Sequence, residues 1–272
     1  MIGAIIGDIV GSRFEFDRSP KVKEFEPFTR KNNFTDDTVM TIAVAQALLR
    51  ADPLADEEEI KTYLVMAMKI WGKKFPHAGY GGRFYHWLFS PGSKPYGSYG
   101  NGSAMRVSSA GWLYNTMDRT REVARWTAEV THNHPEGVKG AESVAAVIFL
   151  ARNGYDKDYI RKYVVDEFGY DLSRTCDDIR PTYHMVESCQ ETVPEAIISF
   201  LEGNNFEDVM RNAVSLGGDS DTLTDIACAM AAGMYEIPDE YIQKARKYLD
   251  PEMIITLENF EIRAKSVAER LI

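Results

Sequence analysis

The sequence predicts an all-α fold. Apolar residues recur with helical spacing through most of the 272 residues, and segments of alternating Val, Ile, Thr and aromatic residues are almost absent. Hydrophobic residues make up 44% of the chain, which is enough to bury one large core. No repeat, low-complexity tract or linker marks a boundary, so we expect a single domain over residues 1–272.

The apolar periodicity predicts helices, in order, over 37–50, 57–71, 103–116, 119–130, 137–152, 157–167, 193–202, 205–215, 221–235, 238–248 and 251–270. The first of them follows Thr35, a good N-cap, and acids are favoured in a first turn by the helix dipole. Pro135 stands just before the first turn of the helix at 137–152, where proline is tolerated.

Two regions do not fit a helical pattern. Residues 72–102 hold eight glycines, and a long glycine-rich loop in a compact domain predicts a binding loop. Residues 168–192 are mixed in character and broken by Pro181, so we expect an irregular excursion without a chemical role there.

The charge and the cysteines restrict the function. The chain has 41 acidic and 31 basic residues, giving a formal net charge of −10. A nucleic-acid partner is therefore not expected, because binding a phosphate backbone requires a basic face, whereas a local phosphate site or divalent cations are compatible. Three scattered cysteines, at 176, 189 and 228, form neither a disulfide framework nor a zinc pattern.

We expect a soluble, cytoplasmic protein that does not insert into a membrane. The start, MIGAIIGDIVGSRFEF, is apolar but lacks the basic segment of a signal peptide and carries Asp8 in its middle. No apolar run approaches the ~20 residues needed to span a bilayer.

Two stretches place paired aspartates directly before an apolar helix. The first is FTDDTVM, with Asp36 and Asp37, and the second is GGDSDT, with Asp219 and Asp221. Helix capping alone explains one such stretch. If the two helix starts meet, however, four carboxylates crowd together and need protons or cations to neutralise them. Carboxylates and threonine hydroxyls are hard ligands, which favours two Mg²⁺ or Mn²⁺ ions over zinc.

A third stretch, GSYGNGSAMR at 97–106, combines glycines with polar side chains directly before a predicted helix. Glycines allow the backbone to approach a ligand closely, and free N–H groups at a helix start attract anions. The stretch therefore predicts a phosphate cradle, although glycines and Asn also serve as punctuation before a helix. It is not a P-loop, because no Lys-Ser or Lys-Thr follows the glycines.

The motifs GDIVGSRFE, FTDDTVM, GSYGNGSAMR, THNHPEG and GGDSDT, in this order, resemble the ADP-ribosylglycohydrolases over nearly the whole chain. The resemblance implies a single-domain orthogonal helical bundle with a binuclear Mg²⁺ or Mn²⁺ centre. It implies that the enzyme removes ADP-ribose from a modified protein or processes an ADP-ribose-containing small molecule.

The resemblance also implies roles for individual residues. The implied metal ligands are Thr35, Asp36, Asp37, Asp219, Asp221 and Thr222. The implied diphosphate-binding loop is Ser98, Tyr99, Gly100, Asn101 and Gly102, and His132 would line the distal pocket. Glu15 matches a glutamate that some members carry on a mobile flap, and its alternative is a solvated surface acid.

Six further residues are candidates with a structural alternative. Asp8 and Asp225 could support the metal centre or be structural. Phe84, Tyr85 and Trp87 could stack on an adenine, but core packing is the default for aromatic residues. His134 is interpreted as a turn residue that bonds the backbone.

The hypothesis is hydrolysis of the bond between C1″ of the distal ribose and its acceptor. Glu15, Asp36 and Asp219 are the catalytic candidates, since Glu15 or a metal-bridging aspartate would take the proton of the attacking water. Two alternatives remain. One is hydrolysis of a free metabolite such as O-acetyl-ADP-ribose, and the other is a non-catalytic ADP-ribose-binding protein. The acceptor linkage stays open among arginine, serine and others.

Overall fold

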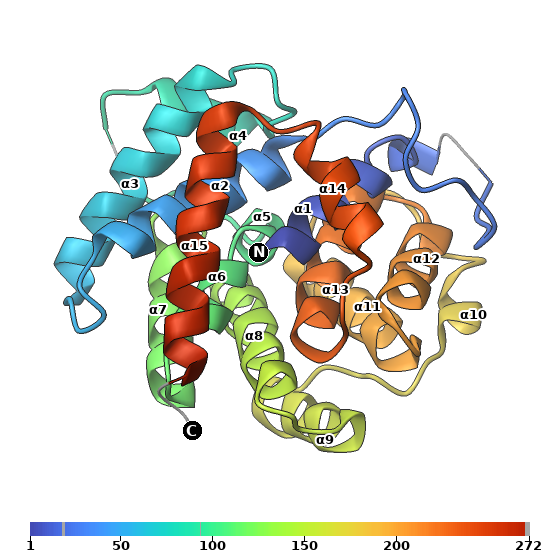
Figure 1. Cartoon of the computed structure of the whole chain (residues 1–272). Helices are drawn as coiled ribbons and strands as arrows, with labels where there is room; N and C mark the ends of the chain where they lie inside the picture. Colours follow the sequence, from blue (N-terminus) through green and yellow to red (C-terminus); the bar gives the residue numbers. More distant parts are fainter. Residues whose placement is uncertain (18–19, 93, 270–272) are drawn as a thin grey trace.

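The computed structural model describes residues 1–17, 20–92 and 94–269 (Figure 1). It confirms the all-α prediction, because these residues form helices and no β-strand, with one isolated antiparallel bridge between Gly100 and Ser188. The helices are α1 (Ile2–Gly11), η1 (Glu15–Asp17), α2 (Asp36–Arg50), α3 (Glu57–Lys74), α4 (Gly82–Phe89), α5 (Gly102–Met105), α6 (Ser108–Leu113), α7 (Met117–Glu129), α8 (Pro135–Arg152), α9 (Lys157–Phe168), α10 (Cys176–Ile179), α11 (Cys189–Glu202), α12 (Phe206–Leu216), α13 (Ser220–Met234), α14 (Asp239–Arg246) and α15 (Pro251–Glu269). Among the described helices, none is both long and apolar enough to cross a membrane.

The centre of the fold is the pair α1 and α13. Helix α13 packs on α1, α8, α11 and α12, while α2 packs on α1, α3 and α15. Figure 1 shows α1 and α13 between the group of α2, α3 and α15 on one side and α11 and α12 on the other. This arrangement brings the amino ends of α2 and α13, which carry the paired aspartates, to the same region.

Helices α1 and α13 approach closely because α1 presents a row of glycines, Gly3, Gly7 and Gly11, to its neighbour. A Cβ atom built on them would lie 2.4, 2.3 and 2.4 Å from the carbonyl oxygens of α13 residues. Glycines four residues apart lie on one face of a helix, so the row permits backbone-to-backbone contact along the whole of α1.

We expect Gly7→Ala to lower the free energy of unfolding by about 3 kcal/mol, because the added methyl group overlaps the carbonyl group of Thr224. The measurement is urea denaturation, with Gly92→Ala as the control, since a Cβ atom there meets nothing within 4 Å. A Gly7→Ala protein as stable as the Gly92→Ala protein would contradict this account of the α1–α13 contact.

The structure differs from the predicted elements at several points. The helix predicted over 103–116 is two short helices, α5 and α6, separated by Arg106 and Val107. The predicted binding loop at 72–102 contains helix α4, and the apolar start of the chain forms the buried helix α1. In the excursion at 168–192, α10 forms one turn and α11 begins at Cys189, four residues before its predicted start at 193. Pro194 lies inside α11 rather than ending it.

Candidate functional site

A cavity of about 300 Å³ opens where the amino ends of α2, α5 and α13 meet. Its wall combines acids from the helix starts, the glycine-rich loop before α5, the glycines at 79, 81 and 82, and side chains from residues 83, 84, 96, 185 and 187. The lining residues are Glu15, Phe16, Asp36, Asp37, Gly79, Gly81, Gly82, Arg83, Phe84, Tyr96, Ser98, Gly100, Asn101, Gly102, Met105, Arg106, His132, Met185, Glu187, Asp219, Asp221 and Thr222.

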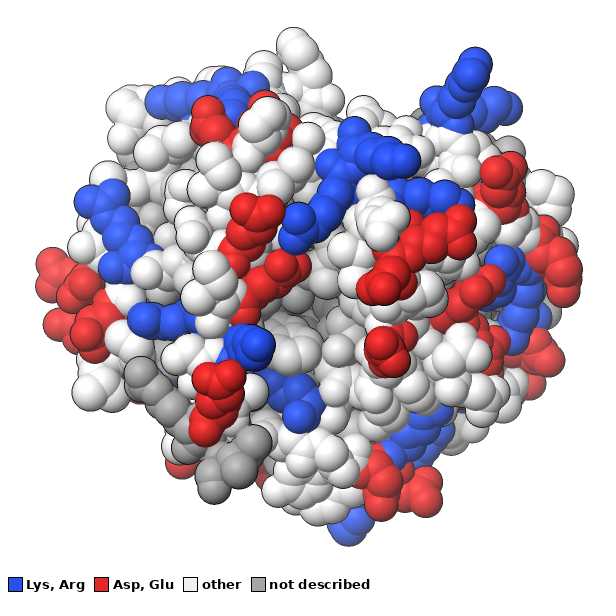
Figure 2. Space-filling view, viewed as in Figure 1, with Lys and Arg blue, Asp and Glu red and all other residues white. Residues whose placement is uncertain are grey.

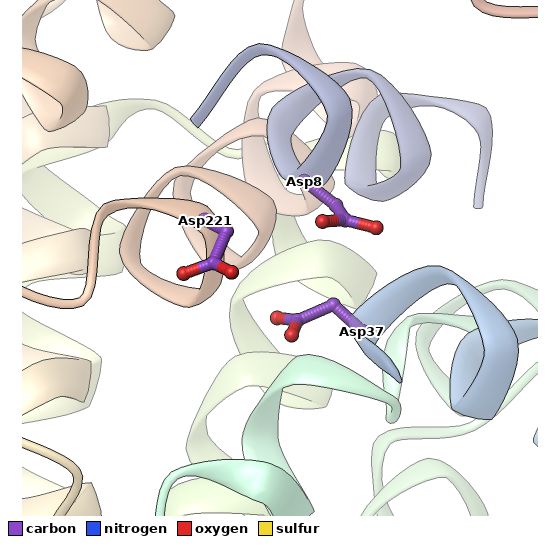
Figure 3. A group of neighbouring side chains, drawn as sticks. All are labelled: Asp8, Asp37 and Asp221. Carbon is purple, nitrogen blue, oxygen red and sulfur yellow. The ribbon is translucent and has the colours of Figure 1, made fainter. Parts of the chain in front are cut away.

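Three buried aspartates from three helices face one another beside this cavity. Asp8 comes from α1, Asp37 from the first turn of α2 and Asp221 from the first turn of α13, and each offers a carboxylate oxygen within 4.8 Å of the others. Figure 3 shows the three carboxylates converging from separate helices. The two acidic helix starts therefore meet, as the paired motifs predict.

Asp8 has its own partners in the first turn of α2. Its carboxylate accepts hydrogen bonds from Thr35 N at 2.9 Å, Thr35 Oγ1 at 2.7 Å and Thr38 N at 3.1 Å, and another from Thr38 Oγ1. It thus holds the start of α2, and with it Asp37, against α1. Asp8 therefore anchors the start of α2 by hydrogen bonds and also adds a carboxylate to the acid group.

A second group of acids shares Asp221 with the first. Glu15, Asp219 and Asp221 each offer an oxygen within 4.8 Å of the others. Asp219 is 6% exposed, and its Oδ2 accepts a 2.6 Å hydrogen bond from Asn101 Nδ2. The glycine-rich loop and the acid cluster are therefore joined directly through Asn101.

The crowding of these acids raises their pKa values. Burial, followed by the charge of Asp221, raises the pKa of Asp8 to about 7. The same two causes, in the same order, hold the pKa values of Asp36, Asp37 and Asp219 well above their usual range. A buried cluster of carboxylates of this kind requires protons or cations to neutralise part of its charge.

The carboxylates of the two acid groups are suited to binding a divalent cation. Asp37 is 2% exposed, and its Oδ1 has no hydrogen-bond partner among the described residues. A buried carboxylate oxygen without a partner is costly unless a ligand satisfies it. All candidate ligands in the two groups are carboxylates, the type that Mg²⁺ and Mn²⁺ prefer.

The glycine-rich loop is held in place by the segment before α11. Asn101 N donates to Glu187 O at 2.8 Å, and Cys189 N donates to Tyr99 O at 2.9 Å. Of the predicted loop residues, Ser98, Gly100, Asn101 and Gly102 line the cavity, whereas Tyr99 is 49% exposed and packs its ring on that of His134.

The remaining predicted residues have the following places. Asp36 and Thr222 line the cavity, but Asp36 belongs to neither group of acids. Thr35 caps α2, accepting from Asp37 N at 3.3 Å, and its hydroxyl contacts Asp37 Oδ2 at 3.2 Å. Asp225 is fully buried, and neither of its carboxylate oxygens has a hydrogen-bond partner in the described part of the chain.

Some of the aromatic residues and histidines named from the sequence line the cavity, and others do not. Phe84 lines the cavity, whereas Trp87 is in the core and Tyr85 is half-exposed. His132 lines the cavity, and His134 caps α8 by accepting from Glu136 N at 3.2 Å, as its interpretation as a turn residue predicts.

Sequence reasoning missed several cavity residues. The excursion at 168–192 was expected to carry no chemical role, yet it supplies Met185 and Glu187 to the wall. Arg83 and Arg106 were also missed. Arg106 had one usable signal, a charged residue within the apolar stretch SAMRVSSAGW, which requires buried partners.

The chain is similar to known ADP-ribosylhydrolases in sequence and to a solved relative in fold. The chain is 26% identical to ADP-ribosylhydrolase ARH3 of Homo sapiens, covering 93% of this chain and 90% of that protein. It is 25% identical to ADP-ribosylarginine hydrolase Tri1 of Pseudomonas putida (strain GB-1), covering 90% and 72%. A solved ADP-ribosylglycohydrolase-related protein complex matches the fold with a TM-score of 0.71 at 22% identity, covering 99% of this chain and 96% of that one.

The family model described as ADP-ribosylglycohydrolase matches residues 1–270. This match covers every acid of the two groups, the glycine-rich loop and His132. The chain belongs to the ADP-ribosylglycohydrolase family and is a hydrolase of ADP-ribose linkages.

Proposed function

We propose that the protein removes ADP-ribose from a modified acceptor by metal-dependent hydrolysis at C1″ of the distal ribose. The observation that carries the proposal is the pair of acid groups joined at Asp221, beside a cavity that the glycine-rich loop also lines. The two groups would offer two adjoining places for Mg²⁺ or Mn²⁺, and Asp221 belongs to both groups. We include in the proposed ligand set Asp36 and Thr222, which line the same cavity, and Thr35, the N-cap of α2.

A divalent cation at this centre supplies Lewis acidity, which polarises water and the hydroxyl groups of the distal ribose. The chain itself positions the reacting groups. Asn101 fixes the Asp219 carboxylate, and Glu15 places a second carboxylate beside it on the cavity wall. Glu15 or Asp219 can therefore accept the proton of an attacking water as the glycosidic bond breaks.

The glycine-rich loop supplies the remote binding energy. Ser98, Gly100, Asn101 and Gly102 present polar groups and backbone to the cavity without bulky side chains between them and a ligand. A diphosphate held there positions the distal ribose against the acid groups, so that binding of the nucleotide contributes to the rate.

Arg83 adds positive charge to the same wall. Its guanidinium donates to Tyr96 O and lies 4.8 Å from the centre of the Tyr96 ring. We expect Arg83→Met to raise the KM for an ADP-ribosylated substrate about tenfold with a smaller change in kcat, because an arginine–phosphate contact acts mainly on binding. Steady-state kinetics beside Arg125→Met, on the exposed face of α7, test this, and an unchanged KM would contradict it.

The proposed partner is an ADP-ribosylated protein or a small molecule containing ADP-ribose. Acidic and basic side chains are interspersed on the face shown in Figure 2. That distribution, with a net charge of −10, does not favour broad contact with a nucleic-acid backbone.

The test is release of ADP-ribose from arginine-linked, serine-linked and O-acetyl-linked substrates with Mg²⁺, with Mn²⁺ and with EDTA. Cation-dependent release from one or more of these identifies the linkage and supports the proposal. Release that is unaffected by EDTA would reject the role of cations. Tight ADP-ribose binding without release from any linkage would instead favour a non-catalytic ADP-ribose-binding protein.

A further inference from the structure

Three buried polar side chains, Arg106, Thr131 and His132, form a hydrogen-bonded chain, and the first and last of them line the cavity. Arg106 is 1% exposed, and its Nη2 donates to Thr127 O at 2.9 Å and to Thr131 Oγ1 at 2.8 Å. Thr131 is fully buried, and its Oγ1 lies 2.7 Å from Nδ1 of His132. His132 is the member of this chain that reaches furthest along the glycine-rich loop.

The direction of these hydrogen bonds follows from the donor inventory. A guanidinium group only donates, so Thr131 Oγ1 must accept from Arg106. The single hydroxyl hydrogen of Thr131 then needs an acceptor, and within the described residues the other hydrogen-bond partner of this oxygen is His132 Nδ1. A buried hydroxyl left without an acceptor is costly, so Nδ1 accepts and the ring proton resides on Nε2.

The surroundings also keep the ring neutral. Burial, followed by the charges of Arg106 and Arg83, lowers the pKa of His132 well below its usual range. Its Nε2 is directed at the loop, since a Cβ atom built on Gly102 or Gly100 would lie 3.3 or 3.5 Å from it. The Nε2 side of the ring therefore faces the loop backbone at Gly100 and Gly102, which both line the cavity.

We propose that Arg106 and Thr131 are positioning residues that fix His132 as the neutral Nε2–H tautomer, which donates a hydrogen bond to an oxygen of the bound substrate. The identity of that substrate as an ADP-ribose compound rests on the proposed function. Phosphate and ribose oxygens share the required chemistry, because both accept a hydrogen bond. The opposite tautomer would turn a nitrogen lone pair toward the same oxygen; it would repel a phosphate oxygen and could only accept a hydrogen bond from a ribose hydroxyl.

The tautomer is measured directly by ¹⁵N NMR of histidine-labelled protein without ligand, with the His132 signals identified by their loss in His132→Asn. We expect the wild type to carry its proton on Nε2 and to have an unprotonated Nδ1. Thr131→Ser keeps the hydroxyl and should preserve this pattern, whereas Thr131→Val removes it and should shift the proton at least partly to Nδ1. A wild-type Nδ1–H, or a Thr131→Val protein with an unchanged tautomer, would overturn the proposal.

Arg106→Met tests whether Arg106 sets the direction of the hydrogen bonds in this chain. Without the guanidinium, the Thr131 hydroxyl could accept a hydrogen bond from Nδ1–H of His132. We expect a mixture of tautomers in this variant. Since the loss of a buried guanidinium can also prevent folding, the Thr131 pair carries the test if Arg106→Met does not fold. An Arg106→Met protein that folds and keeps the wild-type tautomer would show that Arg106 is not a positioning residue.

Calorimetric titration with ADP-ribose gives the functional consequence. We expect Thr131→Val to weaken binding about tenfold and Thr131→Ser by less than about threefold, as for a hydrogen bond to a charged or polar oxygen. Equal affinities in the two variants would reject the donation to substrate. The two proposals fail separately: an inactive enzyme with Nε2–H His132 rejects only the proposed function, and an active enzyme with Nδ1–H His132 rejects only this inference.

Discussion

Asp221→Asn is expected to reduce ADP-ribose release by about a thousandfold or more, which is the largest effect of any single substitution in this account. Asp221 belongs to both groups of acids, so its replacement would remove an anionic ligand from both proposed cation positions at once. Asparagine keeps the size of the side chain and leaves the helix start intact. Initial rates at saturating Mg²⁺ provide the measurement.

Asp118→Asn is the matched control for this substitution. Asp118 occupies the same place in α7 that Asp221 occupies in α13, the second residue of the helix, but it is exposed. We expect its replacement to leave the rate unchanged, since a first-turn acid contributes only a few tenths of a kcal/mol through the helix dipole. If Asp221→Asn kept more than about a tenth of wild-type activity, the shared-ligand arrangement would be wrong.

The metal-free protein is expected to lose stability as the pH rises. Asp8 has a pKa of about 7 in the folded protein, against about 4 in an unfolded chain. Burial raises the pKa values of Asp37 and Asp219 in the same direction. A raised carboxyl pKa stabilises the folded state fully below the unfolded value, and this contribution is lost as the pH rises through the folded value. For Asp8 alone the loss is on the order of 4 kcal/mol at about 1.4 kcal/mol per pKa unit.

Saturating Mg²⁺ is expected to remove most of this loss, because the cations neutralise the ionised carboxylates and bind only the folded state. The measurement is the free energy of unfolding in urea, with EDTA and with Mg²⁺, at about pH 5 and about pH 8. We expect the stabilisation by Mg²⁺ to be larger at the higher pH. The same stabilisation at both values would contradict a cluster that exchanges protons for cations.

Much of the site could be predicted because its residues are local to recognisable helix starts. Asp37, Asp219 and Asp221 were predicted from acids placed directly before apolar helices, and the structure brings Asp37 and Asp221 together. Ser98 and Asn101 were predicted from the glycines around them, and both line the cavity. In each of these cases, the local sequence pattern and the helix start that it forms supplied the information.

The rest of the site depends on contacts between distant segments. Asp8 was ambiguous because its place beside Asp221 results from the α1–α13 packing, which the single-sequence pattern of α1 does not reveal. Glu187 and Met185 line the cavity because the segment before α11 is hydrogen-bonded to the glycine-rich loop. No spacing rule joins residues so far apart in the chain.

The helix predictions are also limited by contacts between distant segments. The sequence predicts the long core helices α8 and α13 to within two residues at each end, because an apolar run of 15 residues or more is a strong signal for a buried helix. The helix predicted at 103–116 is interrupted at Arg106 and Val107, where the Arg106 guanidinium is buried and donates to Thr127 O and Thr131 Oγ1. Tertiary contacts of a single side chain accompany the break there.

The binding of Mn²⁺ measured by equilibrium dialysis tests the central claim most directly, since Mn²⁺ replaces Mg²⁺ at carboxylate sites. We predict two Mn²⁺ ions per wild-type chain, loss of binding in Asp221→Asn, and wild-type binding in Asp118→Asn. A wild-type protein that retains no Mn²⁺, yet releases ADP-ribose at full rate in EDTA, would contradict the account.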